Sequence, residues 1–200
     1  MDRLIEGYRR FRASTWPKEC SRYEELAKMG QKPRSMVIAC SDSRVDPQTV
    51  FDSSPGELFI IRNVAGLVPQ YKPDSSYHGT SAALEYGVRV LKVKHIIVLG
   101  HARCGGVQAM VEGSPAEAKE FVEPWMKIAK KALHSQPPKN VEKLTYYETE
   151  VVRITLENLL TFPWIRDAVM AGDLNLNGFR FDVSNGTLSL LEGDQFVVVE

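Results

Sequence analysis

Two apolar runs that read as buried strands constrain the fold of this chain most strongly. Residues 35–39, SMVIA, end directly at Cys40, and residues 95–100, HIIVLG, end directly at His101. Nearly continuous apolar runs of this length are typical of strands that are buried on both faces of a parallel sheet. Because ligands bind at the carboxyl ends of such strands, we expect Cys40 and His101 to meet at one edge of the sheet.

The remaining pattern predicts the elements around these two strands. A third strand is expected at 56–66, and the alternating tail at 174–183, followed by a turn at 184–186, predicts a C-terminal hairpin. Apolar spacing and helix-start signals predict helices at 2–13, 17–29, 78–93, 105–111, 115–134, 141–161 and 163–171. The predicted fold is a single α/β domain, residues 1–200, with a mostly parallel central sheet flanked by helices, an N-terminal helical arm and a C-terminal hairpin.

The composition argues against several classes of partner. Lys and Arg together number 25, as do Asp and Glu, and no block of like charge occurs, so neither a nucleic acid nor a membrane surface is expected to bind. The first residues lack the apolar core of a secretory signal, and no apolar run has the length of a membrane span. Three cysteines are too few for a disulfide scaffold, and the expected compartment is therefore the reducing cytoplasm.

The segments CSDSR at 40–44 and HARCGG at 101–106 carry the candidate chemistry. Cys40, His101 and Cys104 offer two thiolates and an imidazole, a set that favours one zinc ion with a fourth position left open. His101 and Cys104 are three residues apart, so a single turn can present both to one ion. Each cysteine taken singly is better explained as an ordinary buried thiol, and only the joint pattern favours a metal site.

Asp42 and Arg44 would surround this metal site with charge. A carboxylate that accepts the proton of a zinc-bound water aims the water's lone pair at a substrate, and Arg44 can hold that carboxylate with two hydrogen bonds. If Arg44 released it, Asp42 could reach the metal and close the open position. Two thiolate ligands should leave the water less acidic than three imidazoles do, so we expect turnover to rise on the basic side. A purely structural ion pair is a common alternative, but the two-residue offset of Asp42 from a ligand favours a functional role.

The two motifs closely resemble those of the β-class carbonic anhydrases, whose pattern is C-x-D-x-R followed by H-x-x-C. The resemblance covers roughly residues 20–112, includes PGELFIIRNVAG and ALEYGVRVLKVKHIIVLGH, and is less clear in the C-terminal strands. It implies an α/β fold, a homodimer or higher homo-oligomer, and reversible hydration of CO2 to bicarbonate and a proton.

The resemblance also implies roles for the motif residues. Cys40, His101 and Cys104 match the ligands of one Zn²⁺ per chain. Asp42 and Arg44 match the catalytic dyad, with Asp42 as a fourth ligand in a closed state. CO2 and bicarbonate are the implied small-molecule substrates.

A second group of residues matches the substrate pocket of the family. Gln31 matches an amide that hydrogen-bonds substrate, and Gly105 matches a backbone N–H donor. The apolar and aromatic walls of the CO2 pocket are matched by Phe59, Val64 and Tyr86. In the family this pocket straddles a dimer interface, so some of these side chains would come from the neighbouring subunit.

One departure bears on regulation. Some members carry a non-catalytic bicarbonate pocket that uses a Trp three residues before the first ligand, where this chain has Val37. We therefore expect the plant-like, constitutively open form. Two other functions stay open: the same fold and zinc site acting on a CO2-like sulfur substrate, and a structural zinc module without turnover. The open fourth position argues against the module, because structural zinc sites usually have four protein ligands.

Overall fold

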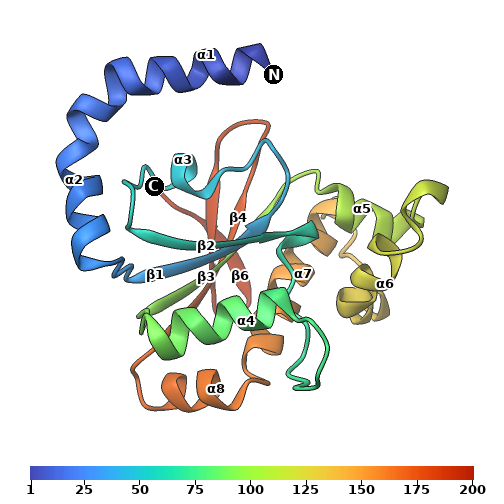
Figure 1. The fold of residues 1–200 in the computed structure, drawn as a ribbon. Coiled ribbons are helices and arrows are strands. Elements are labelled where there is room, and N and C mark those ends of the chain that lie inside the picture. The colour runs from blue at the N-terminus through green and yellow to red at the C-terminus, as the bar shows by residue number, and fades with distance from the viewer.

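A six-stranded sheet in the order β2-β1-β3-β4-β5-β6 forms the centre of the computed structural model, which describes residues 1–200 (Figure 1). The strands are β1 (Ser35–Cys40), β2 (Leu58–Asn63), β3 (His95–His101), β4 (Asn175–Phe181), β5 (Leu188–Glu192) and β6 (Gln195–Val198). The first four are parallel, and β5 and β6 run antiparallel to their neighbours. The predicted mostly parallel sheet with a C-terminal hairpin is thus confirmed, and β6 is an additional strand.

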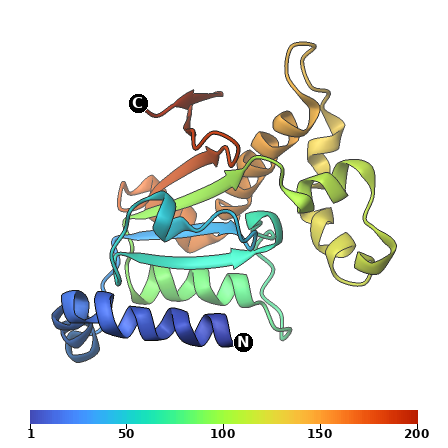
Figure 2. The same cartoon turned by 90° about the horizontal axis from the view of Figure 1, so that it is seen from above.

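Helices connect the strands and cover the sheet. They are α1 (Asp2–Arg10), α2 (Trp16–Met29), α3 (Pro47–Val50), α4 (Gly79–Glu85), α5 (Gly105–Glu112), α6 (Val122–Met126), α7 (Lys143–Leu159) and α8 (Pro163–Met170). Seen from above, the chain after β3 leaves the carboxyl end of the sheet and forms α5 and α6 beyond it (Figure 2). No helix combines the length and the apolar character that a membrane span requires.

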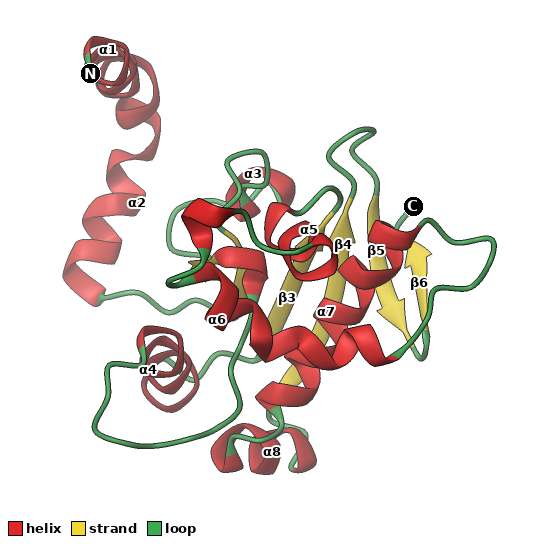
Figure 3. Ribbon diagram, turned by 90° about the vertical axis from the view of Figure 1, so that its right-hand side faces the viewer, coloured by secondary structure: helices red, strands yellow, loops and turns green.

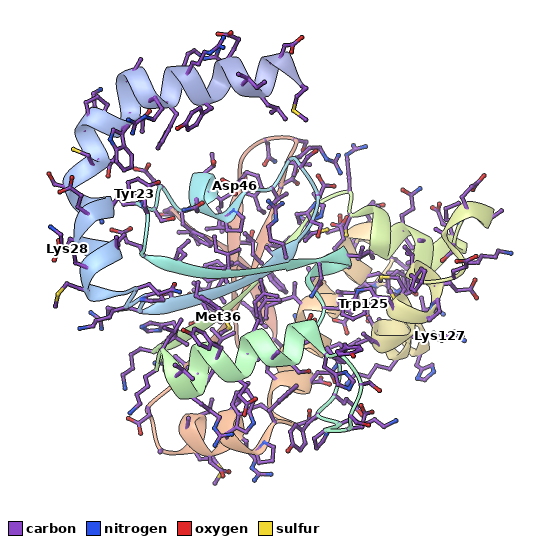
Figure 4. The ribbon with its side chains drawn as sticks, viewed as in Figure 1. Tyr23, Lys28, Met36, Asp46, Trp125 and Lys127 are labelled. Carbon is purple, nitrogen blue, oxygen red and sulfur yellow. The ribbon has the colours of Figure 1, made fainter.

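The side chains of β1 alternate between the two faces of the sheet, as a pleated strand requires. Met36 and Ile38 join the core formed with α4, α7 and α8, and in Figure 4 Met36 lies between β1 and α4. Val37 and Ala39 belong to the core on the opposite face. All four side chains are fully buried. This explains why β1 is apolar at each of the positions 36–39 that precede Cys40.

Two glycines let α7 approach the sheet closely. A Cβ atom at Gly100 would lie 2.5 Å from Cγ2 of Val152, and one at Gly178 would lie 2.9 Å from Cγ1 of the same residue. Figure 3 shows α7 lying across β3 and β4, the strands that carry these glycines. The close packing brings the first half of α7 to the carboxyl end of β3.

Three predicted elements need correction. Residues 2–29 form one continuous helical stretch, in which a π-helical segment, Phe11–Thr15, joins α1 to α2 just before Pro17. Strand β2 ends at Asn63 rather than at residue 66, since Ala65 adopts a left-handed φ of 63°. The helix expected at 115–134 is instead a 3₁₀ turn, Ala116–Ala118, and then α6 continued by a 3₁₀ segment, Lys127–His134. Pro124 lies in the first turn of α6, so a single helix cannot run through it from residue 115.

The N-terminal arm, α1 and α2, stands away from the sheet (Figure 1). None of its residues is buried, and Leu4 and Tyr8 are 73% and 61% exposed. Only α2 approaches the rest of the chain, where Arg22 lies 3.7 Å from Glu57, just before β2. The predicted arm is therefore confirmed, and apolar side chains of α1 such as Leu4 and Tyr8 are largely uncovered within one chain.

Candidate metal centre and active site

The carboxyl ends of the neighbouring strands β1 and β3 bring three candidate ligands together. Cys40 ends β1, His101 ends β3, and Cys104 immediately precedes α5. Their ligand atoms all lie within 4.8 Å of one another, and all three residues are buried. The convergence that the strand pattern predicts is therefore present in the structure.

The arrangement of these atoms fits a divalent metal ion. Sγ of Cys40 lies 4.0 Å from Sγ of Cys104, and a tetrahedral zinc with Zn–S bonds of about 2.3 Å would place two sulfurs about 3.8 Å apart. His101 directs Nδ1 at the carbonyl oxygen of Ala102, 2.9 Å away, while its Nε2 is buried without a hydrogen-bond partner. A buried nitrogen without a partner is costly, and a cation beside the two sulfurs would satisfy it.

The thiols of Cys40 and Cys104 have pKa values that are shifted in opposite directions. Their mutual hydrogen bond holds the pKa of Cys40 well below its usual value, against the effect of burial, and His101 acts in the same direction. The backbone N–H of Ala65 also donates to Sγ of Cys40 at 3.3 Å. The same thiol contact, together with burial, raises the pKa of Cys104. One negative charge is therefore stable at the pair alone, and a bound divalent cation would stabilise the second.

Arg44 holds the carboxylate of Asp42 beside this cluster. The backbone N and Nε of Arg44 each lie 2.9 Å from Oδ1, and Nη2 lies 2.7 Å from Oδ2. Nη2 also donates to the carbonyl oxygen of Arg103 at 3.0 Å. These hydrogen bonds hold the pKa of Asp42 well below its usual range, so the carboxylate is ionised and only accepts hydrogen bonds. Oδ2 lies 4.0 Å from Nε2 of His101.

Arg62 fixes the backbone that carries the first motif, a role that sequence reasoning missed. Its Nε donates to the carbonyl oxygen of Cys40 at 3.0 Å, and its Nη2 donates to those of Asp42 and Val45, both at 2.7 Å. The available signal was a charged residue inside the otherwise apolar strand segment LFIIRN. Such a residue must find polar partners, and here it finds three carbonyl groups.

Sequence reasoning also missed Glu148 and Arg180, which lie behind Cys104. Glu148 is 2% exposed, and its Oε1 accepts the backbone N–H of Cys104 at 3.3 Å. Arg180 donates to the other oxygen of this carboxylate. A signal was present here too, because Glu148 lies among the apolar positions of α7, between Tyr147 and Val151.

Two of the predicted pocket residues lie at the metal centre. Val64 follows β2 directly, and its Cγ1 would lie 2.8 Å from a Cβ atom on Gly106, in the first turn of α5. Nε1 of Trp125 donates to the carbonyl oxygen of Val64 at 2.8 Å, and Figure 4 shows Trp125 at this end of the sheet. A cavity of about 450 Å³ opens beside Val64 and Trp125. Gly105 is the first residue of α5, where backbone N–H groups have no partner within the helix.

The other three lie elsewhere within one chain. Phe59 pairs with Met36, four residues before Cys40, which corresponds to about 13 Å of strand. Its ring packs against that of Tyr86, with centroids 6.0 Å apart, and Tyr86 is 46% exposed. Gln31 precedes the amino end of β1. Their roles in substrate binding stay predictions.

Comparisons with known proteins agree with this geometry. A family model described as carbonic anhydrase matches residues 35–188. β-Carbonic anhydrase 3 of Arabidopsis thaliana is 37% identical over 203 residues, which cover 97% of this chain and 78% of the plant protein. The structure of the β-carbonic anhydrase CcaA matches with a TM-score of 0.88 and 31% identity, over 100% of this chain and 92% of that one. A tetrameric β-carbonic anhydrase of Sordaria macrospora matches with a TM-score of 0.81 and 26% identity, over 95% of both chains.

The chain therefore belongs to the carbonic anhydrase family, and its relatives are of the β class. Its reaction is the reversible hydration of CO2 to bicarbonate and a proton, which makes it a lyase, a carbonate dehydratase. The predicted enzyme class and substrate are thus confirmed.

Proposed function

We propose that Cys40, His101 and Cys104 hold one Zn²⁺ per chain and that CO2 is hydrated at this centre. The observation that carries the proposal is the convergence of two sulfurs and an unpartnered imidazole nitrogen within 4.8 Å. Thiolate and imidazole donors together suit zinc, and three protein ligands are typical of catalytic rather than structural zinc. When bound, zinc supplies Lewis acidity that lowers the pKa of a water in its open position.

Asp42 and Arg44 orient the attacking water in this proposal. Oδ2 of Asp42 faces Nε2 of His101 at 4.0 Å, so it is the oxygen placed to accept a hydrogen bond from a water at the centre. Arg44 keeps this carboxylate ionised and occupies both of its oxygens, which holds it back from ligating the metal. The pair therefore supports the plant-like, constitutively open form.

The environment of Val37 supports the same form. Val37 is fully buried in the core on one face of the sheet, with Ala39 and Leu99. These side chains offer no polar group to a second bicarbonate ion. The enzyme would then be active without a prior switch of Asp42 and Arg44.

A second copy of the chain is the partner that would complete the substrate pocket. Gln31, Phe59 and Tyr86 lie away from the metal centre of their own chain, near the amino ends of β1 and β2 or on the helical stretch after α4. The exposed apolar side chains of the arm, Leu4 and Tyr8 among them, are typical of an interaction surface. We infer a homodimer, or a higher homo-oligomer built from it, in which these side chains face the metal centre of the partner.

A reducing compartment suits this centre, and we propose the cytoplasm. All three cysteines are free thiols, and the sulfurs of Cys40 and Cys104 lie 4.0 Å apart. Oxidation of this pair to a disulfide would remove two of the three metal ligands. Thiols persist in the cytoplasm, where glutathione and thioredoxin keep them reduced.

Zinc content and stopped-flow CO2 hydration test the proposal together. The unmodified chain should carry one zinc and hydrate CO2, and Cys104→Ala should lose both. Cys20→Ala is the matched control, because Cys20 lies in α2 and its Sγ donates to the carbonyl oxygen of Pro17 rather than facing the metal centre. Zinc without hydration at any pH would instead favour a structural module or a CO2-like sulfur substrate. Full activity in Cys104→Ala would overturn the proposed ligand set.

A further inference from the structure

A buried ion pair lies directly behind the metal centre. The side chains of Glu148, on α7, and Arg180, on β4, are 2% and 13% exposed. Nε and Nη2 of Arg180 lie 3.1 and 2.8 Å from Oε2 of Glu148. Burial raises the pKa of Glu148, and the contact with Arg180 opposes this effect. A buried ion pair is a weak source of stability, because the loss of hydration offsets the attraction between the charges.

The second oxygen of this carboxylate links the ion pair to a metal ligand. Oε1 of Glu148 accepts the backbone N–H of Cys104 at 3.3 Å. Cys104 follows Arg103, which adopts a left-handed φ of 56°, and it precedes the first residue of α5 without a capping hydrogen bond from its own side chain. The peptide group that sets the direction of the Cys104 side chain is therefore held by a residue of another helix.

The framework keeps this carboxylate in place. Gly100 and Gly178 allow α7 to lie close to β3 and β4, since a Cβ atom at Gly100 would meet Val152 at 2.5 Å. Arg180 stands opposite Gly100 in the pairing of β4 with β3. The glycine on one strand and the arginine on its neighbour thus place Glu148 between the sheet and Cys104.

We propose that Glu148 is a positioning residue that holds Cys104 in the place from which its sulfur binds the metal, and that Arg180 balances its charge. The inference rests on the proposed function, because it assumes a metal at Cys40, His101 and Cys104. Arg180 pairs with Oε2 of this carboxylate, which leaves Oε1 free to accept the backbone N–H of Cys104. The arginine also balances the charge of the buried carboxylate, so the ion pair adds no net charge behind the metal centre.

Zinc affinity measured by competition with a chromogenic chelator tests this inference. Glu148→Ala should bind zinc about 10- to 100-fold more weakly than the unmodified chain, the usual cost of losing a residue that supports a ligand. Asn158→Ala is the matched control: Asn158 is also 2% exposed on α7 and donates to the carbonyl oxygen of Val68 at 2.8 Å. Its zinc affinity should stay within about twofold of the unmodified chain, because the side chain of Asn158 bonds to Val68 and not to a metal ligand.

The cobalt-substituted protein gives a second readout that fold stability alone would not move. The thiolate-to-cobalt charge-transfer band should shift in Glu148→Ala and stay unchanged in Asn158→Ala. Glu148→Gln keeps an oxygen that can accept the N–H of Cys104, so it should retain the band and lose less affinity. If Glu148→Ala does not fold, the zinc affinities of Glu148→Gln and Asn158→Ala are compared instead. A weaker affinity in Glu148→Gln than in Asn158→Ala supports the role of Glu148, and equal affinities would overturn it.

The outcomes separate this inference from the proposed function. An unmodified chain that binds no zinc would overturn both. Unchanged zinc affinity in a folded Glu148→Ala variant, or an equal loss in Asn158→Ala, would overturn the role of Glu148 alone.

Discussion

The two ends of the parallel strands differ in what one chain can complete. At the carboxyl end, Cys40, His101 and Cys104 come together within 4.8 Å because β1 and β3 are neighbours in the sheet. At the amino end, Gln31 and the Phe59 ring have no metal centre of their own chain to face. In the proposed dimer, the fold of one chain would form the metal centre, whereas the substrate pocket would need side chains from two chains.

The largest expected effect is recovery of activity in mixed dimers. A Cys104→Ala chain lacks the metal centre but keeps Gln31 and Tyr86, and a Gln31→Ala/Tyr86→Ala chain has the opposite defect. In a two-fold symmetric dimer, random mixing makes half of the dimers hybrid, each with one intact site, so co-refolded chains should regain about a quarter of the unmodified activity. Stopped-flow CO2 hydration measures this recovery.

A second mixture controls for unrelated effects of mixing. Asp42 and Cys104 lie at the same metal centre of one chain. Mixing Asp42→Ala chains with Cys104→Ala chains therefore leaves no intact site in any dimer, and no recovery is expected. Recovery in this mixture, or its absence in the first, would contradict a pocket shared between subunits.

The next largest effect on activity is expected from Arg44, which holds the carboxylate of Asp42 at the carboxyl ends of the strands. Arg44→Ala releases the carboxylate of Asp42, which can then approach the metal, and we expect kcat/KM to fall by about 10- to 100-fold with zinc retained. Arg44→Lys should restore little, because an ammonium group cannot make the paired hydrogen bonds of a guanidinium group. Activity and zinc content are measured on the same samples. Unchanged activity in Arg44→Ala would reduce the pair to a structural contact.

A smaller effect on activity is expected from Tyr86, one of the predicted pocket residues that lie away from the carboxyl ends of the strands. Tyr86 is 46% exposed in one chain, so Tyr86→Ala should fold and bind zinc as the unmodified chain does. Loss of an aromatic wall should weaken CO2 binding and raise KM several-fold, by about 1 kcal/mol of apolar contact. A parallel fall in zinc content would show instead that Tyr86 acts on the metal centre of its own chain.

The smallest expected effect is on the free energy of unfolding and comes from the start of α7, the helix that packs near the carboxyl ends of the parallel strands. Hydrogen bonds from the backbone N–H groups of Thr145 and Leu144 lower the pKa of Glu142, the residue that caps this helix. A lowered pKa stabilises the fold above the unfolded value of 4.5, and this contribution is lost as the pH falls through the folded value.

Glu142→Ala should therefore cost about 1 kcal/mol or less at neutral pH, and the difference from the unmodified chain should shrink in acid. Denaturant unfolding at several pH values measures it. Zinc affinity should not change, which distinguishes the cap from Glu148 on the same helix. A difference that grows in acid would contradict the assigned role of the carboxylate.

The sequence predicts the metal ligands better than the residues that hold those ligands in place. The strands that end at Cys40 and His101 are visible because burial on both faces requires apolar residues throughout. Glu148 and Arg180 escape prediction because their contacts depend on how closely α7 packs on the sheet, which Gly100 and Gly178 decide.

Helix continuity is also set by local chemistry that apolar spacing does not reveal. Pro17 lies within an unbroken helical stretch at the N-terminus, just after the π-helical segment that joins α1 to α2. Pro124 lies within the expected helix 115–134, of which only α6 and short 3₁₀ turns form. In the proposed dimer, the placement of Gln31 and Tyr86 relative to substrate would depend on how two chains pack, which the apolar pattern of one chain does not specify.

Anomalous diffraction at the zinc edge, from crystals of the protein as purified, tests the central claim most directly. The account predicts one strong peak per chain about 2.3 Å from the sulfurs of Cys40 and Cys104 and about 2.1 Å from Nε2 of His101. A difference map without a peak between these atoms, or with the two sulfurs joined in a disulfide, would contradict it.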